Sequence, residues 1–160
     1  MEELLLLSLV WGVQISECGI KRQYPDDEVS GRDSEPTGKK TLFIMDSEDD
    51  RKAFFLSNAW ETSVWRRLYV RTFLDGLNLR FPENMRMEDT AYTLSVLMEC
   101  SSLARTDKCL YLYYINPEST MNSEKTKDYY MESHYSLFFR LITVKKLSEL
   151  NHRHTLIGIF

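Results

Sequence analysis

Residues 79–94 read LRFPENMRMEDTAYTL, an extended segment followed directly by a helix. Pro82 biases Phe81 away from helical backbone, so residues 79–82 are expected to be extended. Over residues 89–100, apolar side chains recur at the three- and four-residue spacing of a helix with one buried face. This part of the chain therefore predicts an extended segment that leads into a helix.

Short strands are predicted on both sides of that helix. Residues 102–105 and 110–115 have the composition and alternation of strands, and residues 106–108 between them are expected to form a polar turn. Upstream, residues 13–22 alternate roughly and residues 41–45 could form another short strand. Strands that alternate with helices predict an α/β class, with a few strands of a mixed sheet packed with helices.

Further helices are predicted from local signals. Residues 1–9 are expected to form a helix, whose apolar run is far shorter than the roughly 20 apolar residues that a membrane-spanning helix requires. Ser47 opens another helix, and Asp50 stands three residues on, as in a capping box. Residues 60–74 show helical spacing of apolar side chains, and Gly76 follows where a C-cap belongs.

The composition is that of an ordinary globular domain. The chain has 160 residues, enough for one buried core, and its formal net charge is −4. That charge argues against a broad nucleic-acid-binding face, which would need clustered Lys and Arg. Cys18, Cys100 and Cys109 lack the C-x-x-C spacing of a zinc or redox site. A reduced, cytoplasmic compartment is therefore expected.

Two regions are distinguished along the chain. Residues 1–123 carry the strands and the helices between them, and residues 124–160 form a C-terminal amphipathic helical segment. Apolar side chains of that segment lie near Arg140, Lys145 and Lys146. Two interpretations stay open: a helix that packs on the core, which we favour, and a helix that docks on a membrane surface. The alternative to a purely cytoplasmic location is peripheral contact at the inner face of the membrane.

Four phrases occur in a fixed order: VWRRLYVRTFL at residues 64–74, LRFPENMRMEDTAYTL at 79–94, LYLYYI at 110–115 and NPESTMNS at 116–123. Together they resemble the C-terminal half of the bacterial family-2 glycosyltransferases that build capsule, lipopolysaccharide and exopolysaccharide. That family typically reads V-W-x-K-L-Y, R-F-P-E-G, E-D-x-x-F/Y, L-Y-x-Y-R and S-I-M. ISECGIKR at residues 15–22 also resembles the strand after the family's metal-binding motif. The resemblance covers most of the chain.

The resemblance implies an incomplete GT-A-like domain that carries the acceptor side of the active site. A complete family member begins with strand–helix units that bind a nucleotide sugar, and a D-x-D-type motif holds Mg²⁺ or Mn²⁺. Asp26-Asp27 and Asp49-Asp50 lie instead in a polar loop and in a capping box. No metal or other cofactor is therefore expected in this chain, and Mg²⁺ or Mn²⁺ only in a complete enzyme.

Two classes of function stay open. The first is a glycosyltransferase that moves a sugar from a nucleotide-sugar donor to a saccharide or lipid-linked acceptor, with this chain inactive alone because the donor half is absent. The second is a non-catalytic remnant that acts as a binding or assembly module. The oligomeric state is not indicated by the sequence. An upstream reading frame that encodes the donor half would favour the first class.

Glu88 and Asp89 form the acidic pair of the E-D motif. Inverting transfer needs a carboxylate that takes the proton from the acceptor hydroxyl, and a carboxylate beside a cleft can act as this general base. The resemblance implies this role for Asp89, with Glu88 orienting it or contacting the acceptor. The alternative is structural, because Asp89 before Thr90 at a helix start makes a good N-cap.

Trp65, Arg67 and Tyr69 lie in the V-W-x-K-L-Y phrase, and the resemblance implies that they bind the acceptor. Trp65 would stack on a sugar ring, and Arg67, where the family usually has Lys, would hold a phosphate or a catalytic carboxylate. The alternative makes Trp65 and Tyr69 core aromatics and Arg67 a surface cation.

The loop at residues 116–123 carries the expected donor-phosphate contacts. Ser119 and Asn122 offer a hydroxyl and an amide to the leaving diphosphate of a complete enzyme. Tyr114 stands where the family often has Arg, which removes a cation suited to the pyrophosphate. The alternative for this loop is a polar turn that closes a strand–helix junction.

Overall fold

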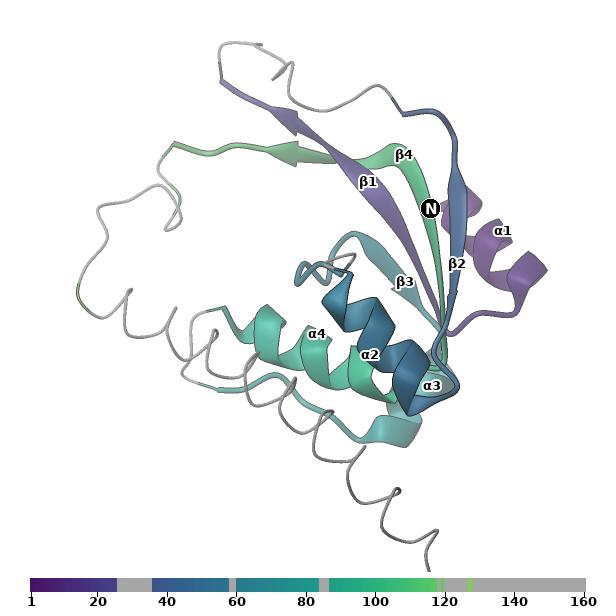
Figure 1. Cartoon of the computed structure of the whole chain (residues 1–160). Helices are drawn as coiled ribbons and strands as arrows, with labels where there is room; N and C mark the ends of the chain where they lie inside the picture. Colours follow the sequence, from purple (N-terminus) through teal and green to yellow (C-terminus); the bar gives the residue numbers. More distant parts are fainter. Residues whose placement is uncertain (26–35, 58–59, 84–86, 118, 120–126, 128–160) are drawn as a thin grey trace, which may run out of the picture.

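In the computed structural model, the described residues are 1–25, 36–57, 60–83, 87–117, 119 and 127. Four strands of this part form one mixed sheet in the order β2-β4-β1-β3 (Figure 1). β1 (Ile15–Gln23) and β4 (Ser102–Tyr114) are central and parallel to each other. β2 (Lys40–Ile44) and β3 (Arg67–Tyr69) flank them in antiparallel orientation. The predicted α/β class is confirmed.

Helices lie on both faces of the sheet (Figure 1). α1 (Glu2–Trp11) packs on one face, where it contacts β1, β3 and β4. The other face carries α2 (Glu48–Leu56), α3 (Arg71–Leu77) and α4 (Glu88–Glu99). The sheet is therefore the middle of three layers, and its two faces have different partners.

Alternation along β1 assigns side chains to these faces. Ile15 belongs to the core shared with α2 and α4. The next residue, Ser16, faces α1 and donates its hydroxyl hydrogen to the Leu4 carbonyl oxygen at 2.9 Å. Because successive side chains of a strand point to opposite faces, Glu17 returns to the face of α2 and α4.

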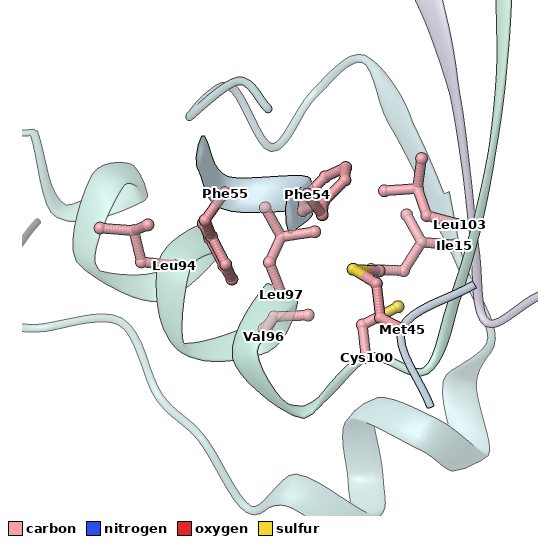
Figure 2. Packing of buried hydrophobic residues seen from close by; sticks show 9 residues of the cluster. All are labelled: Ile15, Met45, Phe54, Phe55, Leu94, Val96, Leu97, Cys100 and Leu103. Atoms are coloured by element: carbon pink, nitrogen blue, oxygen red, sulfur yellow. The ribbon is translucent and has the colours of Figure 1, made fainter. Parts of the chain in front are cut away.

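The main core lies between the sheet and these helices (Figure 2). Phe54 packs edge-on against Phe43 and Phe55, with ring centroids 5.1 and 5.5 Å apart. Burial stabilises by roughly 1.5–3 kcal/mol for each large apolar side chain, so this cluster dominates the stability of the fold. Its buried members are Ile15, Met45, Phe54, Phe55, Leu94, Val96, Leu97, Cys100 and Leu103.

Several local predictions are confirmed. The helix predicted at residues 1–9 and the strands predicted at 13–22 and 41–45 correspond to α1, β1 and β2. At the start of α2, the Asp50 backbone N–H donates to the Ser47 hydroxyl oxygen at 3.1 Å, and the Ser47 N–H donates to the Asp50 carboxylate at 3.3 Å. These reciprocal bonds form the predicted capping box.

The continuous helix predicted for residues 60–74 is wrong. Residues 60–66 are irregular, β3 follows, and the helical part begins only at Arg71 in α3. The apolar spacing combined side chains of an irregular segment, a strand and a short helix, and only some of these, such as Tyr69 and Phe73, pack against the main core. Gly76 lies within α3, and Asn78 is the C-cap instead, in the left-handed conformation with φ 50°.

The polar turn predicted at residues 106–108 is also wrong, because β4 is one continuous strand. Glu17 pairs with Arg105 and Gly19 pairs with Cys109. Gly19 lies two residues after Glu17, whereas Cys109 lies four after Arg105, so β4 has two extra residues here. The polar residues form an irregularity that lets the pairing continue.

The C-terminal helical segment predicted at residues 124–160 lies outside the described residues, except for Lys127. Its interpretation as a core-packing or membrane-docking helix stays a prediction, as does the boundary between the two predicted regions. Within the described ranges, none of the helices is long and apolar enough to cross a membrane.

Gly19 is expected to be required by the irregularity in β4. A Cβ at this position would lie 2.7 Å from the Asp107 carbonyl oxygen and 3.2 Å from that of Lys108. We expect Gly19→Ala to lower the free energy of unfolding by about 1–3 kcal/mol in urea denaturation. Gly76→Ala is the control, because nothing lies within 4 Å of its Cβ position and Ala favours a helix over Gly. Equal stability of the two variants would contradict the steric argument.

Candidate functional site

A buried row of charged side chains crosses three strands. Glu17 of β1 lies in direct register with Arg67 of β3 and with Arg105 of β4. Arg67 Nε lies 2.7 Å from Glu17 Oε2, and both side chains are 0% exposed. Arg105 pairs with the other carboxylate oxygen, Oε1, and its side chain is 23% exposed. The Glu17 carboxylate is thus held between two guanidinium groups.

Sequence reasoning did not identify Glu17 as a site residue. The available signal was a single acidic residue in the middle of a strand with apolar neighbours, ISECGI. A carboxylate at such a position needs a partner, because an isolated buried charge costs several kcal/mol. The partner Arg67 is fifty residues away in the chain, and only the sheet register brings the two together.

The Arg67 guanidinium is engaged by all three of its nitrogens. Besides the bond to Glu17, Nη1 donates to the Ser63 carbonyl oxygen at 2.8 Å and Nη2 to the Glu61 carbonyl oxygen at 2.7 Å. Burial by itself lowers the pKa of Arg67, but the Glu17 carboxylate and Tyr69 together outweigh this effect and the pKa is raised. Arg67 is therefore not the surface cation of the alternative interpretation. It holds a carboxylate, that of Glu17.

Tyr69 lies next to this row and packs against the main core. Its hydroxyl oxygen is buried near the Arg67 guanidinium. Burial raises the pKa of Tyr69, and the nearby Arg67 guanidinium only partly opposes this shift. The position of Tyr69 is thus that of an aromatic side chain packed on the core.

Trp65 lies against two tyrosines of β4. Its ring centroid is 5.1 Å from that of Tyr113 in a nearly parallel stack, at 10° between planes. The Tyr111 ring centroid is 4.4 Å from that of Trp65, and Tyr111 is 37% exposed. Neither tyrosine was among the predicted site residues, although the alternation in LYLYYI places them on one face. The three rings form what we call the aromatic cluster: Trp65, Tyr111 and Tyr113.

Asp89 is the second residue of α4, not its cap. Met87 precedes the helix in the left-handed conformation with φ 58°, and no side chain caps the helix end. The N-cap interpretation of Asp89 is therefore wrong. A non-glycine residue in this conformation costs of order 1–3 kcal/mol, and such strain is frequent near functional sites. Glu88 is exposed at the helix start, and Asp89 is half-buried.

The environment of Asp89 suits a proton acceptor. Burial raises the pKa of its carboxyl, the neighbouring Glu88 adds to the shift, and hydrogen bonds to Thr90 partly oppose it. A carboxylate with a raised pKa is a stronger base than an exposed one.

One hydrogen bond connects α4 to the segment that carries Trp65. The Thr93 hydroxyl donates to the Thr62 carbonyl oxygen at 2.7 Å. Asp89 lies four residues before Thr93, so both belong to the same face of α4. Through Thr62, the segment 61–66 therefore contacts the face of α4 on which Asp89 lies. The same segment contains Trp65 and accepts two hydrogen bonds from Arg67.

The predicted donor-phosphate residues are not joined to this arrangement by any described contact. The Ser119 backbone N–H donates to the Asn116 carbonyl oxygen at 3.1 Å, which is a turn contact. Asn122 lies outside the described residues. Their role toward a diphosphate stays a prediction.

A hollow lies on the other face of the sheet. It has a volume of about 390 Å³ and is lined by α1 and Lys40, away from every predicted site residue. Among the residues whose positions are described, no group of three or more His, Cys, Asp or Glu side chains could hold a metal ion.

Comparison with known proteins gives a partial match. No protein-family model matches the chain. An uncharacterized glycosyltransferase of Bacillus subtilis (strain 168), EpsJ, is 39% identical to it over 69 residues. The match includes 40% of this chain but only 20% of the length of EpsJ. At a general level, the chain is thus similar to part of a glycosyltransferase.

The raised pKa of Asp89 predicts a specific effect on stability. Because the native state holds this proton more tightly than the unfolded chain, wild-type stability falls as pH rises through the carboxyl range toward the raised pKa. Asp89→Asn removes this loss, so the variant should gain stability relative to wild type as pH rises from acidic to neutral. Urea denaturation across this range tests the expectation, with Asp75→Asn as an exposed control. A relative gain toward acidic pH would contradict the direction of the shift.

Proposed function

We propose that this chain is the acceptor-side part of an inverting, family-2-like glycosyltransferase with a GT-A-type domain. The observation that carries the proposal is the placement of Asp89, half-buried in the first turn of α4 with a raised pKa. Its helix face meets the segment that carries Trp65 through the contact between Thr93 and Thr62. The partial similarity to EpsJ supports the general class.

In the proposed reaction, an oxygen of the acceptor attacks the anomeric carbon of the donor sugar. Asp89 takes the proton of that hydroxyl while the new glycosidic bond forms, and the bond from the anomeric carbon to the nucleoside diphosphate breaks. The negative charge leaves with the diphosphate. Glu88, exposed beside Asp89, is proposed to orient the acceptor.

The donor side is proposed to come from residues other than those described. A complete enzyme of this type would use Mg²⁺ or Mn²⁺ to neutralise charge on the leaving diphosphate. The described residues do not supply a fitting ligand set, so no step is assigned to a metal here. The proposed acceptor is a saccharide, free or lipid-linked, and the proposed location is cytoplasmic.

A binding or assembly module is the second candidate function. Two observations favour it: the Arg67 side chain is enclosed by protein groups, and the described residues hold no metal ligand set. A module of this kind would keep the aromatic cluster for binding without turnover.

Removal of the Asp89 carboxylate separates these candidates. We expect the complete gene product to release nucleoside diphosphate from a nucleotide sugar when a saccharide acceptor is present. Asp89→Asn should lower the turnover about 10²–10⁴-fold, the usual contribution of a general base. Asp75→Asn, the same change at an exposed position of α3, should leave turnover unchanged. Near-normal turnover of Asp89→Asn would refute the base assignment, and no release with any donor and acceptor of a broad panel would favour the module.

The donor prediction is tested on this chain alone. Titration calorimetry with UDP-glucose, with and without Mn²⁺, should give no measurable binding, because the described residues lack a metal ligand set. Metal-dependent binding in the micromolar range, about −8 kcal/mol, would show that the donor site lies within these 160 residues.

A further inference from the structure

We propose that Arg67 is a positioning residue: locked in place by Glu17, it fixes residues 61–66 and thereby the Trp65 ring and the contact with the Asp89 face of α4. The structural part of this inference stands alone. Its catalytic consequence rests on the proposed function, because it takes Trp65 and Asp89 as parts of an acceptor site.

The first step is the lock between the two strands. Glu17 and Arg67 are register partners on β1 and β3, and their 2.7 Å bond lies entirely out of solvent. Arg105 binds the second oxygen of the same carboxylate. With both of its oxygens occupied, the carboxylate can rotate little, so it presents one fixed acceptor to Arg67.

The second step is that Arg67, fixed by Glu17, holds the irregular segment of residues 61–66 in place. After its bond to Glu17, Arg67 still has two nitrogens, and these donate to the carbonyl oxygens of Glu61 and Ser63. Such a segment has no strand ladder of its own to fix it, so charge-assisted bonds from a rigid guanidinium decide its path. A lysine could not reproduce the planar fork that reaches three acceptors.

The third step concerns what the segment carries. Thr62, between the two fixed carbonyl groups, accepts the bond from Thr93 of α4. Trp65 follows two residues after Ser63 and stacks on Tyr113. On its far side, Arg66 bonds the Cys18 carbonyl oxygen of β1 at 2.7 Å. Trp65 thus lies between a point held by Arg67 and a point held by β1.

A stabilising role and a positioning role predict different results for Arg67→Met. This variant leaves Glu17 paired with Arg105, so the buried carboxylate keeps a counter-ion and the fold is expected to persist. What disappears is the bond to Glu17 together with the two donors to the carbonyl groups of residues 61 and 63. Arg71→Met is the matched control, because Arg71 lies 92% exposed on α3 in an ion pair with Asp75.

The test is NMR on the full chain. In wild type, ring-to-ring NOEs between Trp65 and Tyr113 and backbone order parameters near 0.85 for residues 61–65 are expected. In Arg67→Met these NOEs should be lost and the order parameters should fall below about 0.6, while β1 and β4 keep theirs. Arg71→Met should match wild type. Unchanged NOEs and order parameters in a folded Arg67→Met variant would overturn the proposal.

Arg67→Lys keeps the inference testable if Arg67→Met does not fold. Lysine retains the positive charge beside Glu17 but lacks the fork, so a folded protein with a mobile segment 61–65 is expected. Failure of both variants to fold would assign Arg67 a purely stabilising role and overturn the inference.

Catalysis supplies a separate readout. In the transfer assay, Arg67→Lys should lower kcat/KM for the acceptor about tenfold or more, the effect of losing one or two charge-assisted bonds, with Arg71→Lys unchanged. Loss of NOEs without any transfer activity in wild type would refute the proposed function but leave the positioning role intact. Loss of NOEs with unchanged kcat/KM would refute the catalytic consequence alone.

Discussion

The paired Glu17 carboxylate is the constraint on which this structure depends. Taking an ion out of water costs several kcal/mol, and that cost is offset only when the geometry of its partners is complete. Here completeness requires three strands in one register, because Arg67 comes from β3 and Arg105 from β4. A slip of any one of them by a residue would turn a charged side chain to the wrong face of the sheet. The ion cluster therefore selects the register of the central strands.

This cluster also divides the central strands into two parts along their length. On one side of it, Ile15 and Leu103 are register partners and belong to the main core. On the other side, Gly19 allows close approach of the irregular part of β4, and the strand continues to Tyr111 and Tyr113. The first part supplies stability, and the second offers half-exposed rings at the edge of the core.

How much of the fold and of the candidate site could be predicted from the sequence depends on how far apart in the chain the interacting residues lie. The capping box of Ser47 and Asp50 is decided within four residues, and it was predicted correctly. The helix predicted for residues 60–74 failed because β3 forms only by pairing with β1, a partner about fifty residues away. For the same reason, Glu17 was missed, and Arg67 was interpreted either as a surface cation or as holding a phosphate or a catalytic carboxylate. Periodicity describes the faces of an element, but it does not show which distant strand will pair with it.

Motif resemblance and geometry contribute different information about the acidic pair. The E-D motif drew attention to Asp89, but the sequence also allowed a helix cap. The structure removes that alternative, since α4 begins at Glu88 with no side-chain cap. A strained Met87 and a half-buried carboxyl with a raised pKa then lie at one helix end. Backbone strain of this kind is frequent near functional sites. Arg67 likewise has contacts of two kinds: it pairs with Glu17 of β1, and its two other donors bind the segment in which Thr62 contacts Thr93 of α4.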